Sequence, residues 1–196
     1  MTIVALRPWA RRLAVGMAGL SAAVVLVAGG IYGAVQYDGN FHAVEPGVVY
    51  RSAQLSGRKL DEVVRGYQIR TVLNLRGDNT GKPWYDEELR TARADGIVHL
   101  DYALSAQREL TQAQMQAVLK LIADAPKPVL IHCNAGSDRT GLASALYELS
   151  RGVPPAEAGA QLSLRYGHFP WFGSRSVAMD RSLAAWVASA PSAPAR

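Results

Sequence analysis

The chain has 196 residues, 49% of them hydrophobic, which is enough for one full domain with an ample core and an appendage. Its formal charge is +5, but three of the 21 basic residues precede a long uncharged run, and the rest of the chain holds 18 basic and 16 acidic residues. A balance of +2, with no basic stripe interleaved with aromatics, does not indicate nucleic acid binding, so no nucleic acid partner is predicted. The single cysteine excludes an intramolecular disulfide.

The uncharged run covers residues 13–35 and is rich in Ala, Val, Leu and Gly. As a helix it would extend about 34 Å, enough to cross the hydrocarbon core of a bilayer. Basic residues lie within 1–12 and the first acidic residue is Asp38, so the positive-inside rule predicts a cytoplasmic N-terminus. We therefore predict a single-pass anchor in a bacterial inner membrane, with the domain on the periplasmic side. A cleaved signal peptide, with small residues at 28–30, stays open as the alternative.

After this run, strand-like and helix-like segments alternate. Residues 36–46 are polar and rich in turn formers, which predicts a linker, and the domain is predicted to cover 47–189. The predicted strands are 48–50, 71–75, 97–100 and 129–131, and the predicted helices are 57–66, 84–94, 111–125 (with Thr111 as N-cap), 140–150, 155–166 and 177–188. This order predicts an α/β fold, a three-layer α-β-α domain with a central, mostly parallel sheet. The Pro- and Ala-rich tail, 190–196, is predicted to be disordered.

Residues 132–141 carry the strongest chemical signal. They read His-Cys-Asn-Ala-Gly-Ser-Asp-Arg-Thr-Gly and connect a predicted strand to a predicted helix. A strand, a Gly-containing loop and a helix N-terminus together direct backbone N–H groups into an anion cradle. Cys133 lies at the mouth of this cradle, a setting that favours a thiolate, and Arg139 can hold two phosphate oxygens with its guanidinium. A buried structural cysteine with a surface Arg139 is the alternative, and the combined pattern weighs against it.

The pattern resembles the signature of the cysteine-dependent protein tyrosine and dual-specificity phosphatases, which is His-Cys, five residues, then Arg and Ser or Thr. Tyr50-Arg51-Ser52-Ala53-Gln54 and Thr71-Val72-Leu73-Asn74-Leu75-Arg76 look like the compact bacterial and atypical dual-specificity branch. The resemblance implies that His132 supports Cys133. Enzymes of this superfamily that act on highly charged inositol phosphates often carry lysine in the loop, and this loop has none, so a polyanionic substrate is less favoured.

Each cradle residue receives a predicted role from this chemistry. Cys133 is the predicted nucleophile, and Thr140 can hydrogen-bond the sulfur and stabilise it as a leaving group. The predicted phosphate-binding residues are Asn134, Ala135, Gly136, Ser137, Asp138 and Arg139.

A leaving alcohol or phenol needs a proton, and a carboxylic acid beside the cradle can deliver it. Asp101 directly follows the predicted strand 97–100, and the ends of parallel strands lie side by side at the ligand edge of a sheet. Its distance of 32 residues from Cys133 also resembles the spacing in dual-specificity phosphatases. A turn cap is the alternative role for Asp101. Asp78, which also follows a strand, is the second candidate, whereas Asp95 precedes its strand.

No metal or organic cofactor is predicted, because His42, His99 and His168 show no ligand spacing with one another or with Cys133.

Three other features receive structural interpretations. Asp86-Glu87-Glu88 is typical of a solvated helix face. The aromatic cluster 166–172 is typical of packing under a helix end, with a substrate groove or a membrane contact as the alternatives. Arg51 could equally bind a second anionic group or form a surface salt bridge.

The sequence therefore predicts a phosphomonoester hydrolase that works through a phosphocysteine, most consistent with a protein-tyrosine or dual-specificity phosphatase. The expected partner is a phosphorylated protein, with a membrane-associated phospholipid, a polyisoprenoid phosphate or an inositol phosphate as the alternative. Two other classes are alternatives: a catalytically dead phosphate-binding module and a rhodanese-like sulfurtransferase. The presence of Cys133, Arg139, Thr140 and Asp101 together argues against both.

Overall fold

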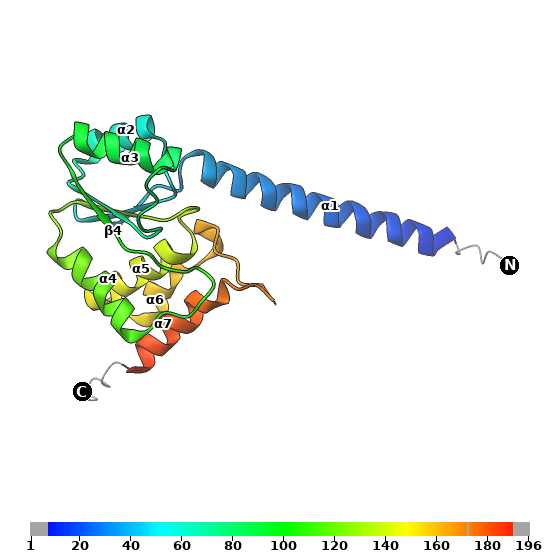
Figure 1. The fold of residues 1–196 in the computed structure, drawn as a ribbon. Helices are drawn as coiled ribbons and strands as arrows, with labels where there is room; N and C mark the ends of the chain where they lie inside the picture. Colours follow the sequence, from blue (N-terminus) through cyan, green and yellow to red (C-terminus); the bar gives the residue numbers. More distant parts are fainter. Residues whose placement is uncertain (1–7, 172, 190–196) are drawn as a thin grey trace. The chain divides into compact units, whose positions relative to one another are not determined.

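The computed structural model describes residues 8–171 and 173–189, which divide into two compact units, Met1–Tyr37 and Asp38–Arg196 (Figure 1). The predicted disordered tail, 190–196, lies outside the described residues.

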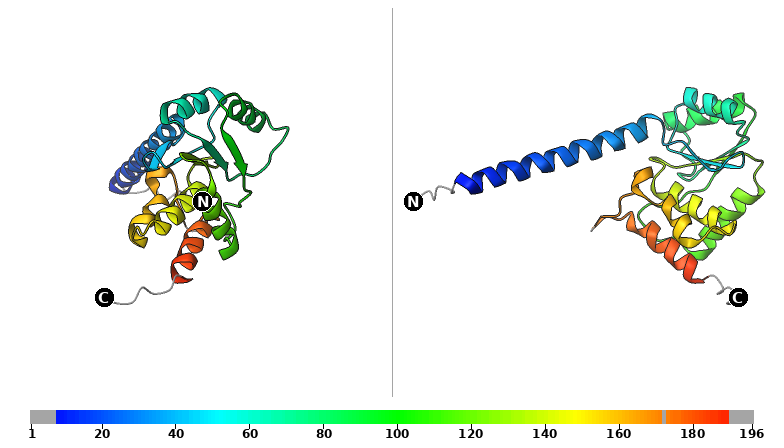
Figure 2. Two further views of the ribbon diagram at one scale, coloured as in Figure 1. Left: turned by 90° about the vertical axis from the view of Figure 1, so that its left-hand side faces the viewer. Right: turned by 180° about the vertical axis from the view of Figure 1, so that it is seen from behind.

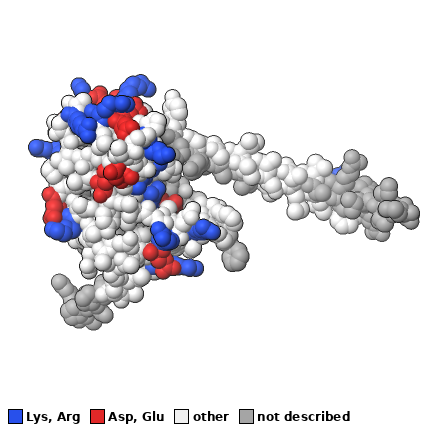
Figure 3. Space-filling model, in the orientation of Figure 1, with Lys and Arg blue, Asp and Glu red and all other residues white. Residues whose placement is uncertain are grey.

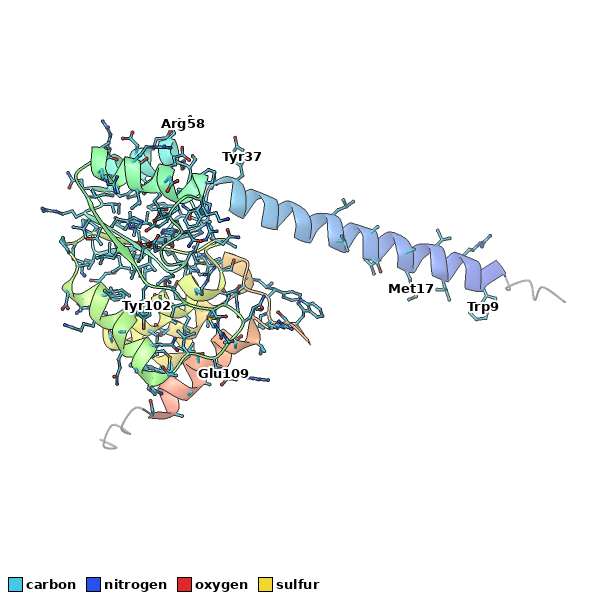
Figure 4. All side chains as sticks on the ribbon, viewed as in Figure 1. Trp9, Met17, Tyr37, Arg58, Tyr102 and Glu109 are labelled. Carbon is cyan, nitrogen blue, oxygen red and sulfur yellow. The ribbon has the colours of Figure 1, made fainter. Side chains whose placement is uncertain are left out.

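The first unit contains one continuous helix, α1 (Pro8–Tyr37), which includes the whole of the predicted anchor, 13–35. The labelled side chains Trp9, Met17 and Tyr37 are exposed and project from it (Figure 4). Within the described residues, however, no helix combines the length and the apolar character needed to cross a membrane, so the predicted transmembrane helix is not found.

The second unit is built around a five-stranded sheet with the order β1-β2-β5-β3-β4. Its strands are β1 (His42–Glu45), β2 (Val49–Ser52), β3 (Thr71–Asn74), β4 (Val98–Asp101) and β5 (Val129–His132). Strand β1 is antiparallel to β2, and all other neighbours are parallel, which confirms the mostly parallel sheet. The linker predicted at 36–46 thus contains an edge strand. Strand β1 lies at the edge of the sheet, and its four residues are half-buried or exposed, so its sequence shows no alternation of apolar and polar residues.

Helices cover both faces of the sheet, as the three-layer prediction requires (Figures 1 and 2). One face carries α2 (Gly57–Tyr67) and α3 (Pro83–Ala94), and the other carries α4 (Gln112–Asp124), α5 (Asp138–Ser150), α6 (Pro155–Ala158) and α7 (Val177–Ser189). Thr111 caps α4 as predicted, with a full capping box that includes Gln114. The single helix predicted at 155–166 is instead α6 followed by two short 3-10 turns, η1 (Gly159–Gln161) and η2 (Leu164–Tyr166).

Side chains of the central strands point alternately to the two faces of the sheet and contribute to a hydrophobic core on each face. In β3, Val72 packs with the α2 side, whereas Leu73 packs with the core under α4, α5 and α7. In β5, Leu130 and Ile131 divide in the same way. Successive side chains of a strand point to opposite faces, so a strand covered on both sides carries apolar residues toward each face. This packing fixes the C-terminal ends of β3 and β5.

The surface of the second unit mixes both charges. On the face in view in Figure 3, basic and acidic side chains alternate without a large area of one sign. Exposed ion pairs such as Arg65–Asp61 at 2.7 Å and Lys120–Asp124 at 2.6 Å contribute to this pattern. Pairs of this kind add little to stability.

Candidate active site

The loop between β5 and α5 is fixed by hydrogen bonds from other segments of the chain to its backbone carbonyls. Three consecutive carbonyl oxygens, those of residues 134–136, accept hydrogen bonds from elsewhere in the chain. The donors are the Gln54 backbone N–H at 3.0 Å, the Asn40 side-chain amide at 2.9 Å and the Arg51 guanidinium at 2.7 Å. In a trans peptide the C=O and the next N–H point in opposite directions. The N–H groups that follow these carbonyls therefore point toward the inside of the loop, as an anion cradle requires.

Gly136 is required at the tightest point of the loop. Its φ is +72°, in the left-handed region that favours glycine. A Cβ atom here would lie 2.7 Å from backbone atoms of Ser52 and Ala53, at the end of β2. The loop therefore packs directly on the neighbouring strand.

Helix α5 begins at Asp138 and has no side-chain N-cap. The first N–H groups of a helix have no partner within the helix, and with the helix dipole they attract anions. The cradle thus combines loop amides with an uncapped helix N-terminus.

Arg51 is fully buried, with 0% of its surface exposed, so a surface salt bridge is wrong. Its guanidinium donates to the Gly136 carbonyl and to the Gln161 carbonyl at 2.9 Å, and it stacks on the Tyr166 ring with 3.8 Å between Cζ and the ring centroid. Burial lowers the pKa of Arg51 to about 10. Its charged group faces the protein, so Arg51 braces the cradle instead of binding a second anion.

The predicted catalytic residues converge at the cradle. Cys133 follows β5 directly and is buried, at 3% exposed. The Arg139 guanidinium donates to the carbonyls of Leu75 and Leu104, both at 3.2 Å, which ties it to the loops after β3 and β4. The Thr140 hydroxyl is buried and has no hydrogen-bond partner among the described residues. Of the other predicted phosphate-binding residues, Asn134 is exposed, Ala135 and Asp138 are half-buried, and Gly136 and Ser137 are buried.

Asp101 is the last residue of β4 and lies at the same edge of the sheet as Cys133. Asn74, at the end of β3, pairs with Asp101 on one side and with His132 on the other. Two strand spacings, about 10 Å, therefore separate the backbones of Asp101 and His132. The Asn74 amide donates to the Asp101 carboxylate at 2.8 Å, and the Tyr85 hydroxyl donates to its other oxygen. The sequence identified Asp101 but not the two residues that hold it.

The second candidate acid is less suitable. Asp78 is exposed and accepts hydrogen bonds from the Thr80 backbone N–H at 2.8 Å and the Thr80 hydroxyl at 2.6 Å. These bonds lower the pKa of Asp78. A carboxylate held in its charged form is a poor proton donor.

The prediction that residues 86–88 form a solvated helix face is wrong for Glu88. It is only 3% exposed and lies on the buried face of α3 together with Tyr85 and Ala92. Its carboxylate accepts hydrogen bonds from His99 at 2.7 Å and from the Gln54 side chain. The spacing of Tyr85, Glu88 and Ala92 along one helix face is the signal that could have found it.

Arg76 is a second arginine at this edge that the sequence did not assign to the site. It follows β3, stacks on Trp84 with 3.5 Å between Cζ and the ring centroid, and donates to the Gln54 side chain at 3.1 Å. Burial, and then the positive charge of Arg139, lower the pKa of Arg76. No carboxylate lies within ion-pair distance of Arg76 in the described part of the chain. Arg76 is therefore an unneutralised cation close to Arg139.

The aromatic cluster is only partly packed. Tyr166 is buried as predicted, whereas Phe169 and Trp171 are 58% and 61% exposed, and Phe172 lies outside the described residues. Within this segment, the buried His168 lies between Asp138 at 2.7 Å and Asp180 at 3.0 Å. These two carboxylates raise the pKa of His168 in spite of its burial. The start of α5 is thereby tied to α7.

Nothing in residues 8–171 and 173–189 groups three His, Cys, Asp or Glu side chains in a way that could hold a metal ion.

A buried thiol at the mouth of a backbone cradle, with an arginine at the start of the following helix, is the arrangement with which a cysteine attacks a phosphate ester. The protein is an enzyme of this class, a cysteine-dependent phosphatase. Its sequence matches the tyrosine phosphatase family over residues 31–160, and the chain belongs to that family.

Solved structures share the fold. TpbA from P. aeruginosa is 24% identical with a TM-score of 0.57, and the match covers 78% of this chain and 85% of TpbA. Tk-PTP is 23% identical with a TM-score of 0.56, covering 74% of this chain and 96% of Tk-PTP. The core catalytic domain of the PP-IP phosphatase SIW14 from S. cerevisiae is 18% identical with a TM-score of 0.58, covering 76% and 91%. No curated relative matches the chain.

Proposed function

We propose that the enzyme is a protein-tyrosine or dual-specificity phosphatase that works through a phosphocysteine intermediate. The observation that carries this proposal is the cradle itself, with three carbonyls held outward and Cys133 at its mouth. A structure of TpbA, 23% identical to this chain, contains phosphotyrosine. That ligand is compatible with the proposal.

In the proposed mechanism the Cys133 thiolate attacks phosphorus and the bond to the leaving oxygen breaks. Arg139 and the cradle N–H groups stabilise the equatorial oxygens of the transition state. Asp101 gives a proton to the leaving oxygen, so an alcohol or phenol departs. Asp101 then takes a proton from water, which attacks the phosphocysteine and releases inorganic phosphate. The Thr140 hydroxyl, which has no hydrogen-bond partner among residues 8–171 and 173–189, can donate to the departing sulfur.

A second candidate substrate class is a small or lipid-borne phosphate with a second anionic group, such as an inositol phosphate, a phospholipid or a polyisoprenoid phosphate. Arg76 favours this class, because it adds a cation beside Arg139 that no carboxylate neutralises among the described residues. It compensates in part for the lack of lysine in the loop. SIW14, which is 18% identical to this chain, is a PP-IP phosphatase, and its substrate class agrees with this alternative.

Phosphate release by the full chain distinguishes these candidates. The substrates are a phosphotyrosyl peptide, the matched phosphoseryl peptide, phosphatidylinositol phosphate in vesicles and a soluble inositol phosphate. We expect the highest kcat/KM for the phosphotyrosyl peptide. Hydrolysis of the lipid or inositol phosphates alone would favour the second class. Binding of phosphate esters without turnover of any would indicate the catalytically dead module.

We further propose that the domain works on the extracytoplasmic side of a bacterial inner membrane. The support is the sequence: an uncharged run at 13–35, preceded by three arginines, with Asp38 as the first acidic residue.

Reporter fusions after Ala195 test this location. Alkaline phosphatase is expected to be active there, and green fluorescent protein exported through the same route is expected to be dark. The reverse pattern would place the domain in the cytoplasm. Release of an active, shortened chain from the membrane would instead indicate a cleaved signal peptide.

A further inference from the structure

His168 is a buried histidine that joins the cradle to helix α7. Its ring nitrogen Nδ1 lies 2.7 Å from Oδ1 of Asp138, and Nε2 lies 3.0 Å from Oδ2 of Asp180. The side chain of His168 is 0% exposed, whereas the two carboxylates are partly exposed. Asp138 is the first residue of α5 and one of the predicted phosphate-binding residues. The ring is therefore fixed against the cradle on one side and against α7 on the other.

Two braces of the cradle also hold the segment that precedes His168. The Asn40 side-chain amide donates to the Tyr166 carbonyl at 2.9 Å, and the Arg51 guanidinium stacks on the Tyr166 ring. The same two side chains hold carbonyls of the cradle loop. The position of the His168 ring relative to Asp138 is thus set by the contacts that fix the cradle itself.

The partners of the His168 ring identify its form. An ionised carboxylate accepts hydrogen bonds and cannot donate one. A ring that donates to both Asp138 and Asp180 carries hydrogen on both nitrogens and is positively charged. Burial alone would lower the pKa of His168, but the hydrogen bonds to these two carboxylates outweigh it and raise that pKa above its ordinary value of about 6.5. The positive ring therefore persists above the pH at which an ordinary histidine loses its proton.

His168 is the cation that pairs with Asp138. Within residues 8–171 and 173–189, no arginine or lysine lies within ion-pair distance of Asp138 or Asp180. Four arginines lie on the same elements, and the guanidinium group of each contacts another partner. These are Arg139 of α5, Arg181 of α7, and Arg165 and Arg175 of the segment that contains His168. The charged groups that face the ring are thus the carboxylates of α5 and α7.

The Asp138 carboxylate is unfavourable for anion binding at the cradle. It lies in the first turn of α5, where the unpaired N–H groups and the helix dipole attract anions. Its charge therefore competes with a bound phosphate for the same positive field, unless a cation beside it offsets that charge.

We propose that the positive ring of His168 offsets the Asp138 carboxylate, so that the cradle binds phosphate groups more tightly when His168 is protonated. His168 acts through Asp138 and is therefore a positioning residue. The inference rests on the proposed function only in taking the cradle as the site of the substrate phosphate. Because the pKa of His168 is raised, the affinity for anions should be highest below that pKa and should fall as the pH rises through it.

Binding of inorganic sulfate to the full chain tests this without any turnover. The parent chain carries Cys133→Ser, which removes the titrating thiol, and sulfate keeps its charge between about pH 5 and about pH 9, a range that brackets the ordinary pKa of a histidine. Calorimetry at constant ionic strength should show about fivefold weaker binding at the upper pH, the order of effect of one charge acting over several ångströms near a protein surface. Affinity that does not change with pH would overturn the proposal.

Two variants of this parent separate the charge of His168 from its role in packing. His168→Asn should bind sulfate about fivefold more weakly than the parent at the lower pH and equally well at the upper pH, where the parent ring is neutral. A merely structural role would weaken binding at both. Asp138→Asn removes the charge that repels the anion, so it should bind more tightly than the parent at the upper pH. Equal or weaker binding by Asp138→Asn there would contradict the proposal.

The matched control is His42→Gln. The His42 ring contacts the Asn40 side chain at 3.2 Å and the edge of Tyr166, and it forms no ion pair with a carboxylate in the described part of the chain. Burial lowers the pKa of His42, so its titration lies below that of His168. His42→Gln should therefore keep the fall in sulfate affinity above about pH 6.5. Loss of that fall in His42→Gln would assign the effect to the wrong histidine.

A measurement on the parent chain covers the case in which His168→Asn does not fold. Linkage requires that an anion bound more tightly by the protonated form raises the pKa of His168 by the same factor. Proton NMR of the four histidine rings should show the His168 midpoint rising by about 0.7 pH unit in saturating sulfate, which is the fivefold factor on a pH scale. Asp180→Asn removes a partner on α7 and should identify the signal by lowering its midpoint. A His168 midpoint that sulfate leaves unchanged would refute the inference.

The outcomes also separate this inference from the proposed function. Hydrolysis of phosphate esters by the wild-type chain, with sulfate binding independent of pH, removes only the role of His168. Sulfate binding that follows the His168 titration, in a chain that hydrolyses no phosphate ester, removes only the phosphatase assignment. Absence of sulfate binding at every pH would overturn the inference, because the cradle would then not hold an oxyanion.

Discussion

Replacement of Cys133 by serine is expected to abolish turnover of an aryl phosphate while leaving the fold intact. The serine hydroxyl is far less acidic than a thiol, so it supplies no useful anion at neutral pH. The change removes little volume at a site that is already closely packed, and the braces of the cradle come from Gln54, Asn40 and Arg51. The cradle should therefore still bind phosphate esters.

The measurement is steady-state hydrolysis of phenyl phosphate together with binding of a phosphotyrosyl peptide. Circular dichroism and thermal unfolding provide the control for folding. Binding with loss of turnover is the expected pair of results. Retention of a tenth of the wild-type kcat would contradict the covalent mechanism. Loss of both turnover and the cooperative unfolding transition would show that the thiol is needed for structure.

Replacement of Asp101 by asparagine should slow hydrolysis of phenyl or tyrosyl phosphate by about 10²–10⁴-fold, the usual contribution of a general acid. Asparagine keeps the shape of the side chain and an oxygen that can accept the Asn74 hydrogen bond, so the geometry at the end of β4 should persist. The loss should be visibly smaller for a nitrophenyl phosphate, because a nitrophenolate leaves without a proton. The basic limb of the pH profile should also flatten.

Asp78→Asn is the matched control, since Asp78 was the second candidate on sequence grounds. Its carboxylate belongs to a local turn with Thr80, so this variant should keep the wild-type dependence on the leaving group. An equal loss for good and poor leaving groups in Asp101→Asn would mean that Asp101 is structural. If the Asp78→Asn variant instead changed the dependence of the rate on the leaving group, Asp78 would be the general acid.

The sequence by itself determined the features that are encoded in contiguous residues. The cradle, 132–141, lies in one segment, so its chemistry could be inferred without knowledge of the fold. The alternation of apolar strands and amphipathic helices predicted a mostly parallel sheet, and a parallel sheet aligns strand ends. This alignment placed Asp101 at the edge that holds Cys133, and the strand register agrees.

Only the tertiary structure decided which polar residues support that site. Arg51 and Gly136 are 85 residues apart, and Asn40 and Ala135 are 95 apart. A local sequence pattern indicates which face of a helix or strand is apolar. It does not indicate which hydrogen-bond donor contacts which acceptor from a distant part of the chain. A buried charge is stable only when partners compensate for its lost hydration. The sequence thus predicts that Glu88 is a solvated helix residue, and only the folded protein buries it against histidines from β4 and β5.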